Sequence, residues 1–206
     1  KKKEKEKNIG TNLYLNIDGE MVGSIVLQDE IKKDAKQTIE SLNKLGIITK
    51  MFTGDSKDIA EEVSKQVGIL EVKYEMLPQD KYTKLEEELS KNITGKKVAF
   101  VGDGINDSPV LARADIGISM GGVGSSSAIE ASDVVIMTDE LSKILEGIQI
   151  SKKTSRVIKQ NLIFAIGTKI AVLLFSILGV ANMWQAVFAD VGTTLITILN
   201  TIRILK

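Results

Sequence analysis

The chain has 206 residues, enough for one or two domains, and it contains neither cysteine nor histidine. Disulfide bonds, Cys/His zinc sites and Ser-His-Asp triads are therefore excluded within this sequence. The 27 basic and 27 acidic residues are unevenly distributed, because residues 151–206 hold seven basic and one acidic residue, while residues 1–150 hold 20 and 26. The acidic first part is not typical of a nucleic-acid-binding protein, so we expect no nucleic-acid partner.

Strand and helix signals alternate over most of the chain. Residues 1–9 are mainly lysine and glutamate, so we predict a solvated charged linker and expect further chain upstream. A hairpin is predicted over 12–27, with its turn at Asp18-Gly19. Helices are then expected over 31–45, 56–67, 78–89 and 106–113, and short strands over 47–52, 98–101, 116–119 and 133–137. This alternation predicts an α/β domain over residues 10–150, with a parallel sheet and helices on both faces.

The composition of the chain changes near Asp139, and two long apolar runs follow. Residues 161–181 and 183–202 each carry one charge, and each is long enough to cross roughly 30 Å of hydrocarbon as a helix. Residues 151–206 are therefore predicted to form a membrane hairpin, with helices over about 160–179 and 183–203. Flanking basic residues place both ends of the hairpin in the cytoplasm beside the soluble domain. The alternative is a pair of buried helices in a water-soluble core.

Polar side chains with a common chemistry stand at the ends of strands and the starts of helices. The segment Val101–Pro109 follows a buried apolar strand, and its Asp103, Asn106 and Asp107 offer hard oxygen atoms suited to Mg²⁺ and a phosphate. Thr53-Gly54-Asp55 ends another strand, and its hydroxyl and N–H groups can hold phosphate oxygens. Further candidates are the Lys81 cation and the close backbone approach at Gly102 and Gly104. Together these residues favour phosphoryl transfer, although an acidic surface turn and a solvated lysine are the alternatives.

These motifs resemble the haloacid dehalogenase-like phosphorylation domain of P-type ATPases, and the similarity covers roughly residues 10–206. It rests on Thr53-Gly54-Asp55, Pro78 with Lys81, the segment 102–109, and the run 120–133. The resemblance implies a haloacid dehalogenase-like Rossmannoid fold in which Thr53 and Gly54 contact the phosphoryl group and Lys81 neutralises it. It also implies that Asp103 ligates Mg²⁺, while Asn106 and Asp107 complete the hydrogen bonds around that site.

The family's nucleophile is the aspartate of an Asp-Lys-Thr-Gly-Thr motif, which this sequence lacks. The nucleotide-binding domain that binds most of the ATP in the family is also absent. The resemblance therefore implies the C-terminal part of an ATP-driven pump, inactive by itself and dependent on the missing N-terminal part of the same protein.

Charged residues inside membrane helices are costly and therefore functional by default. We expect Lys169 and Asp190 to approach the middle of the membrane and to form an ion pair, in which a divalent cation can replace the lysine. The alternative is that the pair only joins the helices. Gly192 is expected to permit close helix packing or backbone access to an ion, with Asn161 and Asn200 in support.

The pattern of these five polar and small residues is similar to the last two helices of the zinc/cadmium/lead subgroup of heavy-metal P-type ATPases. The resemblance implies a multi-pass plasma-membrane exporter of Zn²⁺, Cd²⁺ or Pb²⁺. Two other functions stay open. A membrane-anchored phosphatase of the same fold would need its own nucleophile, for which Asp18 and Asp29 are candidates by residue type only. A truncated product without catalysis is the other.

Overall fold

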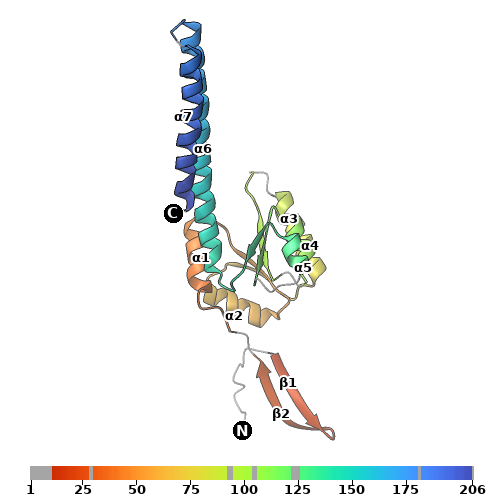
Figure 1. Cartoon of the computed structure of the whole chain (residues 1–206). Coiled ribbons are helices and arrows are strands. Elements are labelled where there is room, and N and C mark those ends of the chain that lie inside the picture. Colours follow the sequence, from red (N-terminus) through yellow and green to blue (C-terminus); the bar gives the residue numbers. More distant parts are fainter. Residues whose placement is uncertain are drawn as a thin grey trace. The chain divides into compact units, whose positions relative to one another are not determined.

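The computed structural model describes residues 11–27, 30–91, 95–103, 106–121, 126–180 and 182–205 (Figure 1). The predicted linker over 1–9, together with Asp29 and Gly104, lies outside the described residues. The chain divides into two compact units, residues 1–145 and 146–206.

The first element is an antiparallel hairpin of β1 (Thr11–Ile17) and β2 (Glu20–Leu27), which forms a sheet of its own. Its two-residue turn has positive φ angles at Asp18 (52°) and Gly19 (86°). Such angles give the turn a twist that matches the twist of the flanking strands. The predicted hairpin and its turn are therefore confirmed. The apolar side chains of this hairpin are largely exposed, among them Leu13, Leu15 and Met21.

The remaining strands pair in parallel, which confirms the predicted α/β class. They form two hydrogen-bonded groups: β3 (Lys50–Phe52) with β4 (Glu71–Lys73), and β5 (Ala99–Gly102), β6 (Ile116–Met120) and β7 (Val134–Ile136) in that order. Strand β6 is the most buried because it has a neighbour on each side. Strand β4 was not predicted, since a three-residue segment with two charged residues gives no apolar run.

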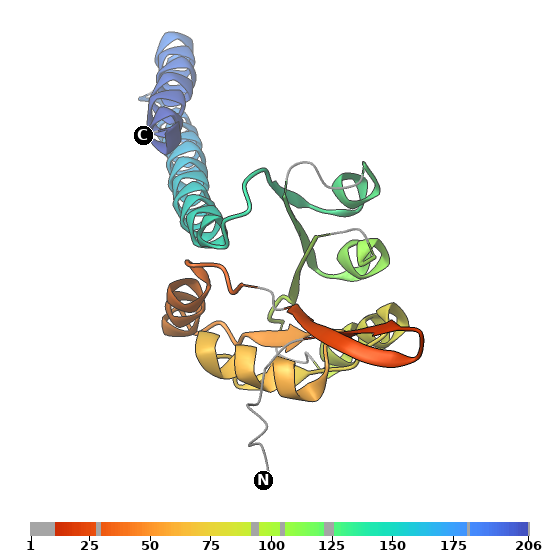
Figure 2. The same cartoon turned by 90° about the horizontal axis from the view of Figure 1, so that it is seen from below.

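Five helices complete the first unit: α1 (Ala35–Lys44), α2 (Lys57–Val67), α3 (Pro78–Lys91), α4 (Ser108–Arg113) and α5 (Ser126–Ala131). Helices α4 and α5 lie on one side of strands β5–β7, and α1 lies on the other (Figure 2). The four expected helices are confirmed, with α4 beginning at Ser108 instead of residue 106, whereas the six-residue α5 was not expected. As predicted, α2 ends at Gly68, whose φ is 86°. At the other end of α2, the Ser56 side chain makes no capping hydrogen bond.

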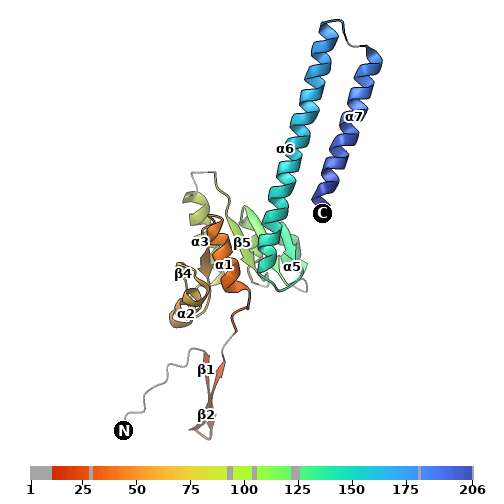
Figure 3. The same cartoon turned by 90° about the vertical axis from the view of Figure 1, so that its left-hand side faces the viewer.

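The C-terminal part consists of α6 (Ser142–Ile177), α7 (Met183–Ile202) and a short 3₁₀ turn, η1 (Arg203–Leu205). Figure 3 shows α6 and α7 as antiparallel neighbours. Helix α6 begins at Ser142 instead of near residue 160, because the helical spacing after Asp139 continues into the apolar run without a proline to end it.

Both C-terminal helices are long and apolar enough to cross a membrane. Within the chain, only 0% and 6% of their apolar windows are buried. The alternative of two helices inside a water-soluble core therefore does not describe this structure.

Among the described glycines, Gly117 lies closest to the backbone of another segment. A Cβ atom there would lie 2.4 Å from the carbonyl oxygen of Leu111, so only glycine fits without moving α4. Gly117 also exchanges two hydrogen bonds with Asp133, which donates its N–H (2.9 Å) and accepts at its carboxylate (2.8 Å). The backbone of β6 thus fixes the position of α4, which begins directly after Asp107.

Substituting Gly117 with alanine should destabilise the chain by about 1–3 kcal/mol, because the clash is with backbone that cannot rotate away. Gly23→Ala is the matched control, since a Cβ atom there meets nothing within 4 Å. Urea unfolding of the whole chain in detergent micelles, followed by circular dichroism, measures both. Equal midpoints for the two variants would contradict the close approach.

Candidate phosphate site

The predicted phosphate-binding turn directly follows β3. The N–H of Thr53 donates to the carbonyl of Lys73 (2.9 Å), which extends the pairing with β4 by one residue. The Thr53 hydroxyl donates to Asp55 Oδ2 (2.7 Å), and the Asp55 N–H donates back to Thr53 Oγ1 (3.1 Å). The turn is therefore held by its own side chains, and Asp55 orients the hydroxyl that was predicted to contact phosphate.

Lys50 holds the strand that carries this turn. Its ammonium lies 2.7 Å from Glu71 on β4 and 2.8 Å from Glu88 on α3. These hydrogen bonds, with Glu71 contributing most, raise the pKa of Lys50 above its ordinary value and keep it charged. Lys50 was not identified from the sequence, since its two partners are 21 and 38 residues away and show no local pattern.

The start of α3 packs against the same turn. The Met76 N–H donates to the carbonyl of Thr53 (3.0 Å), and a Cβ atom at Gly54 would lie 3.3 Å from the carbonyl oxygen of Met76. The carboxylate of Asp80 accepts the Leu77 N–H at 2.8 Å, which satisfies a backbone donor at the helix start. Lys81 therefore stands in the first turn of a helix whose entry is fixed to the Thr53 turn.

The Lys81 side chain reaches the turn after β5. Its Nζ lies 3.0 Å from both carboxylate oxygens of Asp107, and the two side chains are 18% and 11% exposed. Asp107 occupies the N-cap position of α4. A Cβ atom at Gly102 would lie 3.5 Å from Asp107 Oδ2 and 3.2 Å from the Phe100 ring, so glycine leaves room for this carboxylate.

The structure thus brings together Lys81, Asp107 and the backbone of Gly102, and it links the Thr53 turn to Lys81 through Met76. No hydrogen bond within the described part of the chain joins Thr53 directly to Lys81 or Asp107. Asp103 and the exposed Asn106 lie on the same turn as Asp107.

The donor set for a metal at this turn is small. Among the residues that the structure describes, no group of three or more acidic side chains lies close enough to hold a metal ion. Both oxygens of Asp107 contact Lys81, and Asp103 and Asn106 are the other side chains of the turn that carry oxygen atoms. One carboxylate with water and phosphate oxygens is a usual magnesium environment, so this set fits Mg²⁺ only together with a bound phosphate.

The second predicted site lies in the α6–α7 hairpin. Lys169 Nζ stands 3.9 Å from Asp190 Oδ1, which confirms the predicted ion pair. The pair borders a cleft of about 120 Å³, whose other lining residues are Thr168, Val172, Ala186, Ala189 and Thr193. The hydroxyl of Thr193 donates to the carbonyl of Ala189 (2.6 Å) on its own helix.

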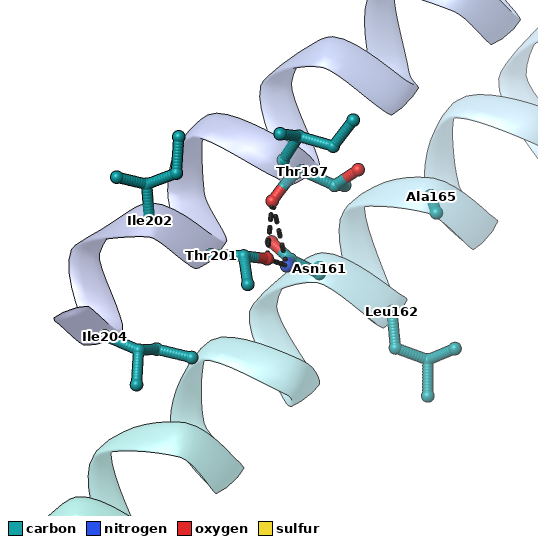
Figure 4. A pocket seen from close by; sticks show the side chains of 8 residues that line it. Asn161, Leu162, Ala165, Thr197, Thr201, Ile202 and Ile204 are labelled. Carbon is teal, nitrogen blue, oxygen red and sulfur yellow. Dashed lines mark hydrogen bonds between the residues drawn. The ribbon is translucent and has the colours of Figure 1, made fainter.

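Asn161 and Asn200 bond to each other instead of joining the Lys169–Asp190 pair. Asn200 Nδ2 donates to Asn161 Oδ1 (2.8 Å), and Asn161 Nδ2 donates to Thr201 Oγ1 (2.9 Å). Asn161 and Thr201, which face each other in Figure 4, are among the residues that line a larger apolar cavity of about 660 Å³. Asn161 is eight residues before Lys169, which places the two about 12 Å apart along the helix.

Gly192 does not serve the close helix packing expected of it. A Cβ atom at Gly192 would meet no described atom within 4 Å, so α6 and α7 do not need glycine there. The expected backbone access to an ion at this position stays a prediction.

Comparisons with known proteins bear on both sites. Residues 1–115 match the family described as haloacid dehalogenase-like hydrolase. The chain is 50% identical over 98% of its length to a cadmium, zinc and cobalt-transporting ATPase of Bacillus subtilis (strain 168), and it covers 29% of that protein. It is 48% identical over 96% of its length to a zinc-transporting ATPase of Synechocystis sp. (strain ATCC 27184 / PCC 6803 / Kazusa), of which it covers 27%.

The structure is also similar to the crystal structure of a zinc-transporting PIB-type ATPase in its E2.Pi state, with a TM-score of 0.84 and 33% sequence identity. That match covers 98% of this chain and 32% of the other chain. The chain thus spans less than a third of the length of each of these three proteins.

Replacing Lys81 with methionine should destabilise the chain by about 1–3 kcal/mol, because it leaves the largely buried Asp107 carboxylate without its partner. Lys84→Met is the matched control on α3, since its partner Glu87 is 48% exposed, and it should cost less than about 1 kcal/mol. Urea unfolding of the whole chain in detergent measures both. Adding Asp107→Asn to Lys81→Met should recover part of the loss, and a control as costly as Lys81→Met would contradict the assignment.

Proposed function

Because the chain belongs to the haloacid dehalogenase-like hydrolase family, we propose that it is the C-terminal segment of a P-type ATPase that exports Zn²⁺, Cd²⁺ or Pb²⁺. The observation that carries this proposal is 50% identity, over 98% of the chain, to a cadmium, zinc and cobalt-transporting ATPase. The Lys81–Asp107 pair and the two apolar helices support it, since they supply a phosphate-binding cation and a route across a bilayer.

In the proposed reaction, phosphate is transferred to an aspartate outside this chain and then to water. The Thr53 hydroxyl and the N–H of Gly54 would donate hydrogen bonds to the phosphoryl oxygens. Lys81, already charged against Asp107, would neutralise them. Asp103 would hold Mg²⁺ together with the phosphate, and Asn106 would donate a hydrogen bond nearby. Bound Mg²⁺ would supply further neutralisation of the phosphate charge.

Three observations support a dependence on other parts of a longer protein. The sequence contains no Asp-Lys-Thr-Gly-Thr nucleophile motif, and it spans 29% of the Bacillus relative. Strands β3 and β5 each have a single hydrogen-bonded neighbour within the described residues, so a further strand can pair beside the turns that carry Thr53 and Asp103. ATP would bind mainly to a domain outside this chain.

The transported ion would interact with the α6–α7 hairpin. A divalent cation at Asp190 would displace the Lys169 ammonium from the carboxylate, and return of the lysine would favour release of the ion. Basic residues at both ends of the hairpin favour cytoplasmic ends, with the first unit on the same side of a plasma membrane.

The purified chain alone should not hydrolyse ATP, because it lacks the nucleophile motif. Phosphate release in the presence of MgATP and zinc checks this, with Thr53→Ala as the control for contaminating activity. Zinc-stimulated hydrolysis that disappears in Thr53→Ala would contradict the dependence on a missing segment.

The intact transporter should hydrolyse ATP in response to Zn²⁺ and not to Cu⁺. Lys169→Ala should lower the zinc-stimulated rate about tenfold, since the proposed release step loses its internal cation. Lys159→Ala removes an exposed charge from the same helix outside the apolar run and should leave the rate unchanged. ATPase and uptake assays in inside-out vesicles measure both. Full activity of Lys169→Ala would leave the ion pair with only a structural role, and stimulation by copper alone would refute the metal class.

A further inference from the structure

Asp34 stands at the start of one helix but binds the start of another. It occupies the N-cap position of α1, where an aspartate usually accepts an N–H of its own helix, yet its side chain makes no such hydrogen bond. Asp34 Oδ2 instead accepts the N–H of Ser142 at 2.8 Å, across 108 residues of sequence. Ser142 is the first residue of α6, and its N–H has no partner within that helix.

A second contact joins the same two segments. The ammonium of Lys32, two residues before Asp34, forms an ion pair with Asp139, three residues before Ser142. The segment that leads into α1 is therefore attached to the segment that leads into α6 at two places. All four residues belong to the first unit, so these contacts lie within one compact body.

The charge of Asp34 suits this position. Hydrogen bonding from the Ser142 N–H, the largest cause, lowers the pKa of Asp34 below its ordinary value, with a smaller contribution from Lys32. The carboxylate is therefore ionised at neutral pH, next to the positive end of the α6 dipole. Lys32 is the charged group that acts on Asp34, and Lys32 itself pairs with Asp139.

Helices α1 and α6 connect the two sites described above. α1, whose Ala35, Ile39 and Leu42 are buried, leads through a short loop into β3, and Thr53 directly follows that strand. α6 is a single helix from Ser142 to Ile177 and carries Lys169. Attachment of the two helix starts therefore offers a route by which a displacement of α1 at the Thr53 turn would reach α6.

We propose that Asp34 is a positioning residue that attaches the start of α6 to α1, so that phosphate binding at the Thr53 turn is transmitted to α6. This inference rests on the proposed function for its phosphate-loaded state. The attachment itself is a property of this chain and can be measured without transport.

The first experiment measures the attachment by hydrogen–deuterium exchange of the whole chain in detergent. Asp34→Ala should speed exchange of the Ser142 amide about fivefold, the usual effect of losing an N-cap. Asp34→Asn should stay near wild type because an amide oxygen also accepts the bond. The control is Asp58→Ala, which removes an exposed aspartate from the first turn of α2. Exchange in Asp34→Ala as slow as in Asp58→Ala would overturn the proposal.

The second experiment measures transmission in the intact transporter, with Mg²⁺ and orthovanadate as the phosphate probe. Vanadate should change exchange over residues 142–146 in the wild type and in Asp34→Asn, and it should leave Asp34→Ala unchanged. An equal response in Asp34→Ala, or no response in the wild type, would overturn the proposal. Absence of zinc-stimulated turnover would refute the proposed function alone, since neither exchange readout depends on metal transport.

Discussion

The contact on which the first unit depends is the ion pair between Lys81 and Asp107. The parallel strands of the first unit form two groups, and no hydrogen bond between described strands connects β3–β4 with β5–β7. Helices α3 and α4 connect the two groups instead, through Lys81–Asp107 near their starts and Glu86–Arg113 further along. Leu85 and Leu111 are almost fully buried on these helices. The relative positions of the Thr53 and Asp103 turns therefore depend on side-chain packing more than on strand pairing.

This arrangement also explains why a lysine suits the site. Asp107 holds the ammonium in a position where both side chains are mostly shielded from water. Partial burial strengthens the attraction between the two charges, because water screens them less. A phosphoryl group bound at the Thr53 turn would offer Lys81 a second anionic partner. The lysine would then lie between two anions, which costs little reorganisation when phosphate arrives or leaves.

Several polar side chains of the α6–α7 hairpin find partners within the hairpin. Thr168, Thr194 and Thr201 donate their hydroxyls to carbonyls four residues earlier on their own helices. Asn161 and Asn200 bond across the helix pair, and Lys169 lies near Asp190. Among the described residues, no buried side-chain nitrogen or oxygen lacks a partner. Such pairing is what an apolar bilayer requires, because it offers no hydrogen bonds in exchange. The polar residues of the hairpin thus serve helix association at one end and a charged pair two turns away.

Local sequence patterns identified most elements and most candidate residues. Apolar periodicity located α1 and α2, Pro78 located the start of α3, and aspartate with glycine located the hairpin turn, because these signals lie within a few neighbouring residues. Residue type, together with position at strand ends and helix starts, predicts that Lys81, Asp103 and Thr53 belong to one phosphate site. The very short β4 and α5 were missed, since three residues of strand and six residues of helix each hold less than two periods of their own pattern.

The sequence by itself determined the class of this protein: an α/β unit with turns predicted to bind phosphate, followed by two apolar helices. Only the tertiary structure decided which partners these residues take. It paired Asp107 with Lys81, Asn161 with Asn200, and Asp34 with the first N–H of α6. These partners are between 26 and 108 residues apart. Periodicity and local propensity describe neighbours along the chain, whereas such contacts arise only when packing brings distant segments together.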